Sequence, residues 1–221
     1  MTGWFANVDW IEIVRASLDT LAMLGGSLAL TVIFGLPLGI ALFLTGPGQA
    51  WASRAANGLL ALVVNLLRSL PFIILLIVMI PLTLLIMGTS LGVAGAIPPL
   101  VAGAAPFFAR LVETALREVD RNTVEAVQAM GATTRDLVVR ALLPEALPGI
   151  IAGATVTAVA LVSFTAMAGV VGAGGLGDLA IRFGYQRFQT DVMIVTVALL
   201  LILVQLLQMT GDALVRRFSR R

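Results

Sequence analysis

The chain has 221 residues and contains no cysteine, no histidine and no lysine. Without cysteine or histidine there can be no disulfide, no Cys/His metal site and no nucleophile activated by a histidine base, so we expect neither a metal nor a catalytic residue. A phosphate-binding P-loop needs a lysine, and the chain is therefore not expected to hydrolyse ATP by itself. These absences predict a protein that is not an enzyme.

Charged residues are also scarce. They make up 12% of the chain, which is about half the share of a typical soluble domain. Hydrophobic residues make up 59% and the mean hydropathy is +1.04. A soluble protein of this length could not bury so much apolar surface, whereas a lipid bilayer takes the place of a core. The net charge is only +2 and no basic stripe carries interleaved aromatic residues, so lipid is an expected partner and nucleic acid is not.

Stretches without any charged residue mark the membrane spans. There are four of them: 20–53, 69–109, 146–177 and 192–211. A helix needs roughly 20 apolar residues to cross the hydrocarbon core, and the second stretch is divided by glycines and prolines between 88 and 99. The sequence therefore predicts an all-α membrane protein, with one domain over residues 1–221 and five transmembrane helices at about 20–44, 60–86, 96–117, 147–170 and 191–214.

The arginines are unevenly shared between the two ends of these helices. Nine fall on one side: Arg54, Arg117, Arg121, Arg135, Arg140, Arg216, Arg217, Arg220 and Arg221. The other side has three: Arg15, Arg182 and Arg187. The positive-inside rule makes the first side cytoplasmic, which places the N-terminus outside and the C-terminus inside.

The first 19 residues do not resemble a cleavable signal peptide, because they lack its basic start. They carry Trp4, Phe5 and Trp10 among acidic neighbours. Aromatic residues favour the membrane–water interface, so residues 1–19 are expected to form an interfacial segment in the outer leaflet.

The longest polar segment, residues 117–146, joins the third and fourth spans on the predicted cytoplasmic side. Asn122 can cap a short helix over Thr123–Met130, with Glu125 reaching back in a capping box, and Gly131 can end it. Such a short helix is marginal in water by itself. Helices that lie on lipid usually carry a basic face, which this one lacks, so a protein partner is favoured over lipid headgroups.

A second short helix is expected after a tight corner. Thr133 or Thr134 can cap its start, because a hydroxyl oxygen accepts from a free N–H of the first turn. Pro144 is expected to stop it, because proline has no N–H and clashes with the preceding turn.

This segment resembles the cytoplasmic EAA loop of ABC importer permeases in Glu125-Ala126-Val127, Gly131 and Leu143-Pro144. Val127 stands where a second alanine is usual and Ala141 where isoleucine is usual, and both are apolar changes. The resemblance implies a coupling helix that docks on an ATPase subunit. It also implies a set of coupling residues: Glu125, Ala126, Val127, Met130, Gly131, Leu143 and Pro144.

The resemblance narrows to methionine importer permeases and covers the chain from about residue 17 onward. It rests on four segments: 68–76, 103–107, 142–149 and 171–177. It implies a homodimer of five-span subunits in the bacterial plasma membrane, two ATP-binding subunits and an external substrate-binding lipoprotein. ATP and magnesium would then bind to the partner subunits, with no cofactor in this chain.

Residues 172–177 read G-A-G-G-L-G, which matches the dinucleotide-binding pattern literally. That interpretation requires a preceding strand, whereas a hydrophobic helix comes before this segment. We expect instead that the glycines at 172, 174, 175 and 177 let the backbone turn sharply after the fourth span. The resemblance places Gly172, Gly174, Gly175 and Gly177 near the outer mouth of the pathway.

Three charged residues lie in or beside the spans, where charges usually face protein or water. Arg110 and Glu113 are three residues apart on one helical face and can pair. Together with Arg68 they form either structural ion pairs near the boundary, with snorkelling side chains, or a polar wall of the inner vestibule. Beside Arg68, Ser69 and Pro71 are candidate path residues.

The fourth span offers further candidates for the path. Ser163 and Thr165 can contact a polar solute, and Met167 can close a narrow apolar pore because its side chain is flexible. Ordinary packing of small residues between helices is the competing interpretation. We predict that this helix lines the path, because two copies of it could meet at a dimer axis.

Three functions compete. The first is the membrane subunit of an ATP-driven importer for methionine, as the D- or L-form, or for another amino acid. The second is a dimeric ion-coupled transporter, which needs a titratable group within the membrane; Glu113 is the sole candidate. The third, an intramembrane enzyme, is disfavoured because the chain has no histidine, cysteine or paired membrane carboxylates.

Overall fold

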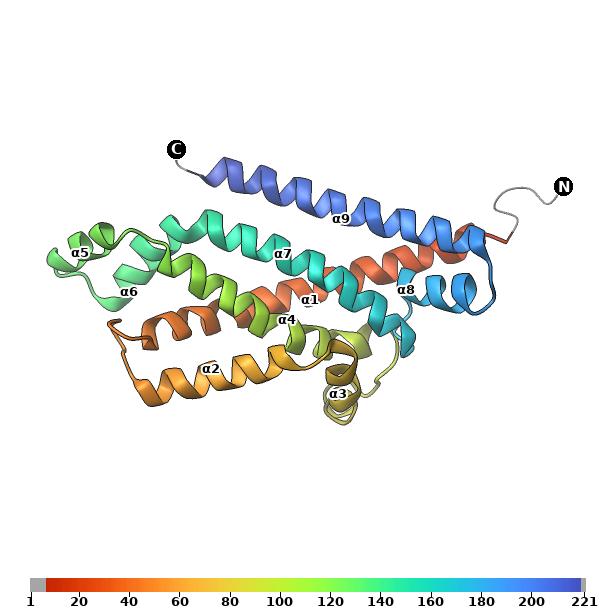
Figure 1. Cartoon of the computed structure of the whole chain (residues 1–221), viewed down its shortest axis with the longest axis horizontal. Coiled ribbons are helices and arrows are strands. Elements are labelled where there is room, and N and C mark those ends of the chain that lie inside the picture. The colour runs from red at the N-terminus through yellow and green to blue at the C-terminus, as the bar shows by residue number, and fades with distance from the viewer. Residues whose placement is uncertain (1–6, 220–221) are drawn as a thin grey trace.

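A computed structural model describes residues 7–219, and these residues form helices and turns without any strand. The elements are α1 (Trp10–Thr45), α2 (Arg54–Ser69), α3 (Phe72–Met87), α4 (Gly92–Arg117), α5 (Arg121–Ala129), α6 (Thr134–Asp136), the π-helix η1 (Leu137–Leu142), α7 (Leu143–Val170), α8 (Gly175–Leu179), the π-helix η2 (Ala180–Tyr185) and α9 (Thr190–Phe218). Figure 1 shows α1, α4, α7 and α9 running along the long axis, with α5 and α6 at one end and α8 at the other.

Four helical stretches are long and apolar enough to cross a bilayer: α1, α4, the continuous stretch Thr134–Val170 and α9. The pair of α2 and α3 meets the same test when it is taken together as one broken span. Counted that way, the described residues contain five spans, which confirms the predicted fold class.

The second predicted span is wrong as a single helix over 60–86. Helix α2 ends at Ser69, and α3 leaves it at a bend of 110°. The residue before a proline is pushed out of the helical region, and Leu70 accordingly has φ −79° and ψ 131° before Pro71. Figure 1 shows α3 nearly end-on, across the direction of α2.

The first span begins earlier than predicted. The Asp9 carboxylate accepts from the Ile11 and Glu12 N–H groups, and α1 therefore starts at Trp10 rather than near Thr20. The predicted interfacial segment thus continues into the helix, while Trp4 and Phe5 lie outside the described residues, as do Arg220 and Arg221. The charge pattern located the edge of the apolar stretch, which is not the edge of the helix.

Helix α4 packs most closely on α1, because two glycines of α1 face it. A Cβ added at Gly39 would lie 2.6 Å from the Ala109 carbonyl oxygen and 2.6 Å from the Val112 Cβ. At Gly35 the nearest atom, the Ala105 carbonyl oxygen, would lie 2.9 Å away. Small residues at a spacing of four allow such close helix contact. The two backbones therefore approach one another and fix α4 in the middle of the bundle.

Candidate coupling elbow and solute path

Helix α5 is capped by a residue that the sequence analysis did not choose. The Asp120 carboxylate accepts from the Asn122 N–H at 2.9 Å, so the helix begins at Arg121. The predicted Asn122 cap and its capping box with Glu125 are therefore wrong: Asn122 lies inside the first turn. The predicted end is confirmed, because Gly131 has φ +78°, a conformation that favours glycine.

The two faces of α5 differ in exposure. Val124 and Val127 are partly buried and pack against the apolar cluster formed by the neighbouring ends of α1, α4, η1 and α7. Glu125 and Ala126 are exposed, and Met130, directly after the helix, is 78% exposed. The predicted coupling residues of α5 are thus divided: Val127 holds the helix to its own subunit, while Glu125, Ala126 and Met130 face outward.

The second short helix is joined to the long helix α7 without interruption. Thr133 Oγ1 accepts from the Asp136 N–H at 3.2 Å, which confirms the predicted cap. Pro144 does not stop the helix, contrary to prediction: α6 passes through η1 into α7. The Leu143 N–H bonds back to the Val138 carbonyl across the π-helix, and Pro144 occupies the first turn of α7, where a missing N–H costs little.

This arrangement has a mechanical consequence. Residues 121–136, which we call the elbow, consist of α5, the turn at Gly131 and α6. The elbow is attached to the core by two valines and is continuous with a helix that ends at Val170. Leu143 is half-buried in the same cluster, and Pro144 is exposed. The chain therefore runs from α5 through the turn at Gly131 into one continuous helical stretch that includes α7.

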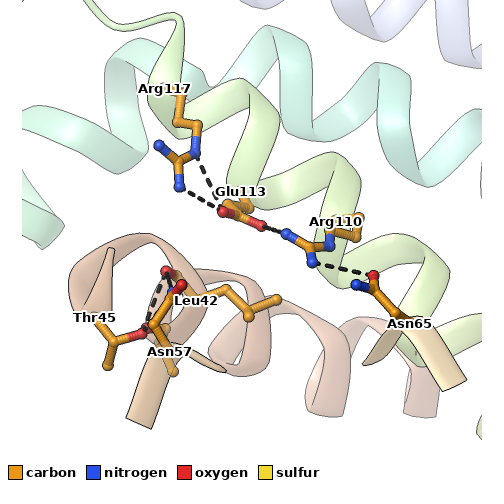
Figure 2. Close-up of polar contacts among 8 residues, drawn as sticks. Leu42, Thr45, Asn57, Asn65, Arg110, Glu113 and Arg117 are labelled. Atoms are coloured by element: carbon orange, nitrogen blue, oxygen red, sulfur yellow. Dashed lines mark hydrogen bonds and ion pairs between the residues drawn. The ribbon is translucent and has the colours of Figure 1, made fainter. Parts of the chain in front are cut away.

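A buried carboxylate joins two arginines on α4. Glu113 is 4% exposed, and its oxygens lie 2.6 Å from Arg110 Nη1 and 2.7 Å from Arg117 Nη2. Arg110 Nη2 donates to Asn65 Oδ1 of α2 at 3.1 Å, as Figure 2 shows. The predicted pair of Arg110 and Glu113 is confirmed, and Arg117 is an addition that the sequence analysis missed, although it lies four residues after Glu113.

A second polar contact fastens α2 to α1. Asn57 Nδ2 donates to the Leu42 carbonyl at 2.9 Å and to Thr45 Oγ1 at 3.1 Å, as Figure 2 also shows. Together with the contact between Arg110 and Asn65, it ties α2 to both helices of the core. Helix α2 is therefore held at its start by α1 and further along by α4.

The candidate path residues of α7 do not share one face. Ser163 is exposed and Met167 is 44% exposed, so both lie on the outer stripe of the helix. Thr165 is 1% exposed, and its hydroxyl donates to the Val162 carbonyl at 2.8 Å. The structure thus separates Thr165, which faces the core of its own subunit, from the other two.

A cavity of about 380 Å³ lies beside the break between α2 and α3. Arg68 lines it from the last turn of α2, with its guanidinium carbon 5.8 Å from the centre of the Phe107 ring. Phe72 and Phe164 also line it, and their rings stack at 4.4 Å between centroids with 7° between planes. The sequence analysis singled out Arg68 but missed Phe72 and Phe164, because nothing local indicates that α3 and α7 meet here.

Ser69 and Pro71, the other candidate path residues at this break, act mainly on the backbone of α2 and α3. Ser69 Oγ donates to the Asn65 carbonyl of its own helix at 2.7 Å. Pro71 stands at the start of α3, where no side chain caps the first turn. Both residues are exposed, and their place in the solute path stays a prediction.

The glycine segment forms the expected sharp turn between α7 and α8. Gly172, Gly174 and Gly175 have φ of +91°, +79° and +84°, which only glycine adopts readily. Gly177 serves differently: it lies inside α8 with its Cα against the backbone of Ala166 on α7. The segment is thus a close-packed corner of two helices, with none of the strand-to-helix geometry of a nucleotide-binding loop.

These features define a helical membrane component built around one broken span and a protruding elbow. The family model for binding-protein-dependent transport system inner membrane components matches residues 35–221, and the chain belongs to this family.

Individual relatives are similar over almost the whole length. The chain is 48% identical to the probable D-methionine transport system permease protein MetI of Vibrio cholerae, over 99% of this chain and 96% of that protein. It is 45% identical to the methionine import system permease protein MetP of Bacillus subtilis, over 99% of this chain and 98% of that protein. A solved structure of the MetNI methionine ABC transporter in an inward-facing conformation superposes with a TM-score of 0.94 at 47% identity, covering 96% of this chain and 98% of that one.

Proposed function

We propose that the chain is the permease subunit of an ATP-driven importer for methionine. The observation that carries this proposal is the elbow: a short helix held by Val124 and Val127, with an outward face at Glu125, Ala126 and Met130, and a continuous connection to α7. Relatives at 48% and 45% identity are named as methionine permeases, which supports methionine as the substrate. The amino acid is carried as the D-form, the L-form or both.

The proposed assembly contains two copies of this chain, two ATP-binding subunits and an external substrate-binding lipoprotein. The N-terminus lies outside and the C-terminus in the cytoplasm, so that the elbow faces the ATPases. ATP and magnesium are bound by those partners, and this chain supplies no cofactor. The similarity to a MetNI ABC transporter supports the ATP-binding subunits and the pairing of two permease copies, and membership of the family of binding-protein-dependent transport components supports an external binding protein.

Transport would proceed by alternating access. ATP binding closes the ATPase subunits, which displaces the elbow and, through the continuous helix from α6 to α7, rocks the spans toward the outward-open state. The external protein then releases its amino acid into the path. No step needs a titratable group in the membrane, and Glu113, the sole candidate for ion coupling, is bound on both sides by arginines.

Reconstitution tests the proposal directly. The complete transporter in proteoliposomes should take up labelled methionine only when ATP is supplied on the side of the ATPase subunits. Unlabelled D-methionine, L-methionine and other amino acids would rank the substrates by competition. Uptake of a different amino acid but not of methionine would contradict the assignment of methionine as the substrate. Uptake driven by an ion gradient without ATP would contradict the assignment as an ATP-driven importer.

A further inference from the structure

The cavity at the break between α2 and α3 has one charged residue in otherwise apolar surroundings. It is formed where four helices meet, and its walls include Leu67, Leu75 and the three rings of Phe72, Phe107 and Phe164. Its volume of about 380 Å³ falls within the range of small-molecule sites, roughly 300–1,000 Å³. The cavity is therefore large enough for one amino acid.

Arg68 has no acidic partner in this cavity. Among residues 7–219, five ion pairs join Arg110, Arg117, Arg140 and Arg182 to carboxylates, and none involves Arg68. Its guanidinium group lies over the ring of Phe107. An arginine beside a membrane span normally faces a counter-charge or water, so an anion that entered this cavity would meet a guanidinium group with unused donors.

The rest of the cavity suits an apolar side chain. Phe72 and Phe164, whose rings stack on one another, line the cavity, and thioether sulfur atoms make favourable contacts with aromatic rings. Gly103 also lines the cavity, and a Cβ there would crowd the Phe72 ring at 3.3 Å.

We propose that this cavity is a substrate site within the permease, where Arg68 binds the carboxylate of an amino acid and the phenylalanines hold its apolar side chain. The inference rests on the proposed function and adds to it a specificity-determining residue. It predicts that the permease itself selects small amphipathic carboxylates after the external protein has released them. Acidic amino acids, whose second carboxylate would lie against the phenylalanine wall, are excluded by desolvation.

Direct binding tests this site in the assembled permease–ATPase complex without the external protein. Binding of labelled methionine is measured by equilibrium dialysis, with binding to the ATPase subunits alone subtracted. Arg68→Gln should weaken binding roughly tenfold or more, because it removes charge-assisted hydrogen bonds. Arg68→Lys should bind methionine with an affinity between those of the wild type and Arg68→Gln. Arg54→Gln, an exposed arginine at the start of the same helix, is the matched control and should bind as the wild type does.

A change in the ligand separates recognition from damage to the fold. Methioninamide lacks the carboxylate and should bind the wild type roughly tenfold more weakly than methionine. In Arg68→Gln the two ligands should bind alike, which a general structural defect would not produce. If Arg68→Gln fails to assemble, the same two ligands are compared in Arg68→Lys. The difference in affinity between methionine and methioninamide should then be smaller than in the wild type.

The outcomes distinguish this inference from the proposed function. If the wild type transports methionine and Arg68→Gln binds and transports it equally well, the cavity is not a substrate site, although the importer assignment stands. The same result is expected if Arg68 serves only a lipid phosphate. If the wild type does not transport methionine, the proposed function itself fails.

Discussion

The contact between α1 and α4 yields a quantitative prediction from two glycines of one helix. At Gly39 an added methyl group would lie 2.6 Å from the Ala109 carbonyl and 2.8 Å from Val112 Cγ1, and the carbonyl is backbone that cannot rotate away. At Gly25, on the same helix, an added methyl group would have no neighbour within 4 Å. Gly39→Ala must therefore push the two helices apart, whereas Gly25→Ala meets no obstacle within this chain.

The expected magnitudes have opposite signs. Alanine in place of glycine within a helix stabilises it by about 1 kcal/mol, and this gain applies at both positions. At Gly39 overpacking costs about 1–3 kcal/mol, which leaves a net loss of up to about 2 kcal/mol. One kcal/mol corresponds to roughly 2–4 °C in Tm for a chain of this size. Gly39→Ala should therefore melt at a lower temperature than the wild type, and Gly25→Ala at the same or a higher one.

Thermal unfolding of the purified protein in detergent, followed by circular dichroism at a helical wavelength, measures both variants. The wild type and Gly25→Ala serve as references under one detergent condition. If Gly39→Ala were as stable as Gly25→Ala, the close approach of α1 to α4 would not exist, and the reasoning from the glycine spacing would be refuted.

Three further predictions concern the polar cluster, the break and the elbow. Glu113→Gln leaves Arg110 and Arg117 without a counter-charge and should cost about 2 kcal/mol, seen as a Tm lower by roughly 4–8 °C; an unchanged Tm would contradict the role of the ion pairs. Pro71→Ala removes the restraint on the preceding residue and should reduce the bend between α2 and α3, measured as a longer distance between spin labels on the two helices; an unchanged distance would show that tertiary packing alone sets the bend. Met130→Ala should lower ATP-driven uptake without lowering Tm, because this exposed side chain lies on the proposed docking face. Uptake at the wild-type rate would show that Met130 does not contribute to docking.

Local patterns predicted much of the architecture because they depend on short-range physics. Charge-free stretches, divided at the glycines and prolines between 88 and 99, placed the spans, since a charge is costly in the hydrocarbon core of a bilayer. The pair of Arg110 and Glu113 followed from a spacing of three on one helix, and the turn at Gly131 followed from the ease with which glycine adopts a positive φ. Each of these inferences needed only neighbours in sequence.

The errors arose where several residues competed for one role. Asp120 and Asn122 are both good caps, and the structure uses the earlier one, which lengthens α5 at its start. Pro144 is a helix breaker in an α-helix, but the π-helix before it leaves Pro144 in a first turn, where its missing N–H matters little. The sequence alone does not show whether Asp120 or Asn122 caps α5, or whether the helix continues through Pro144.

The candidate cavity could not be predicted at all from one sequence. Phe72 and Phe164 lie in different predicted spans, and their stacking depends on the bend of 110° at Pro71. The proline indicates a break in the helix, but its restraint on the preceding residue does not specify that angle. Arg68 could be singled out because a charge at a span is unusual. Its surroundings required the fold.

The central claim is that the outward face of α5 receives the motion of an ATPase subunit, and cross-linking tests it most directly. The chain has no cysteine of its own, so a single introduced cysteine is its only thiol. Met130→Cys should form a reducible cross-link to a cysteine on the ATPase subunit, and this link should block ATP-driven uptake until it is reduced. Val127→Cys, on the inward face of the same helix, should not cross-link. Equal cross-linking at both positions, or none at Met130→Cys, would contradict the account.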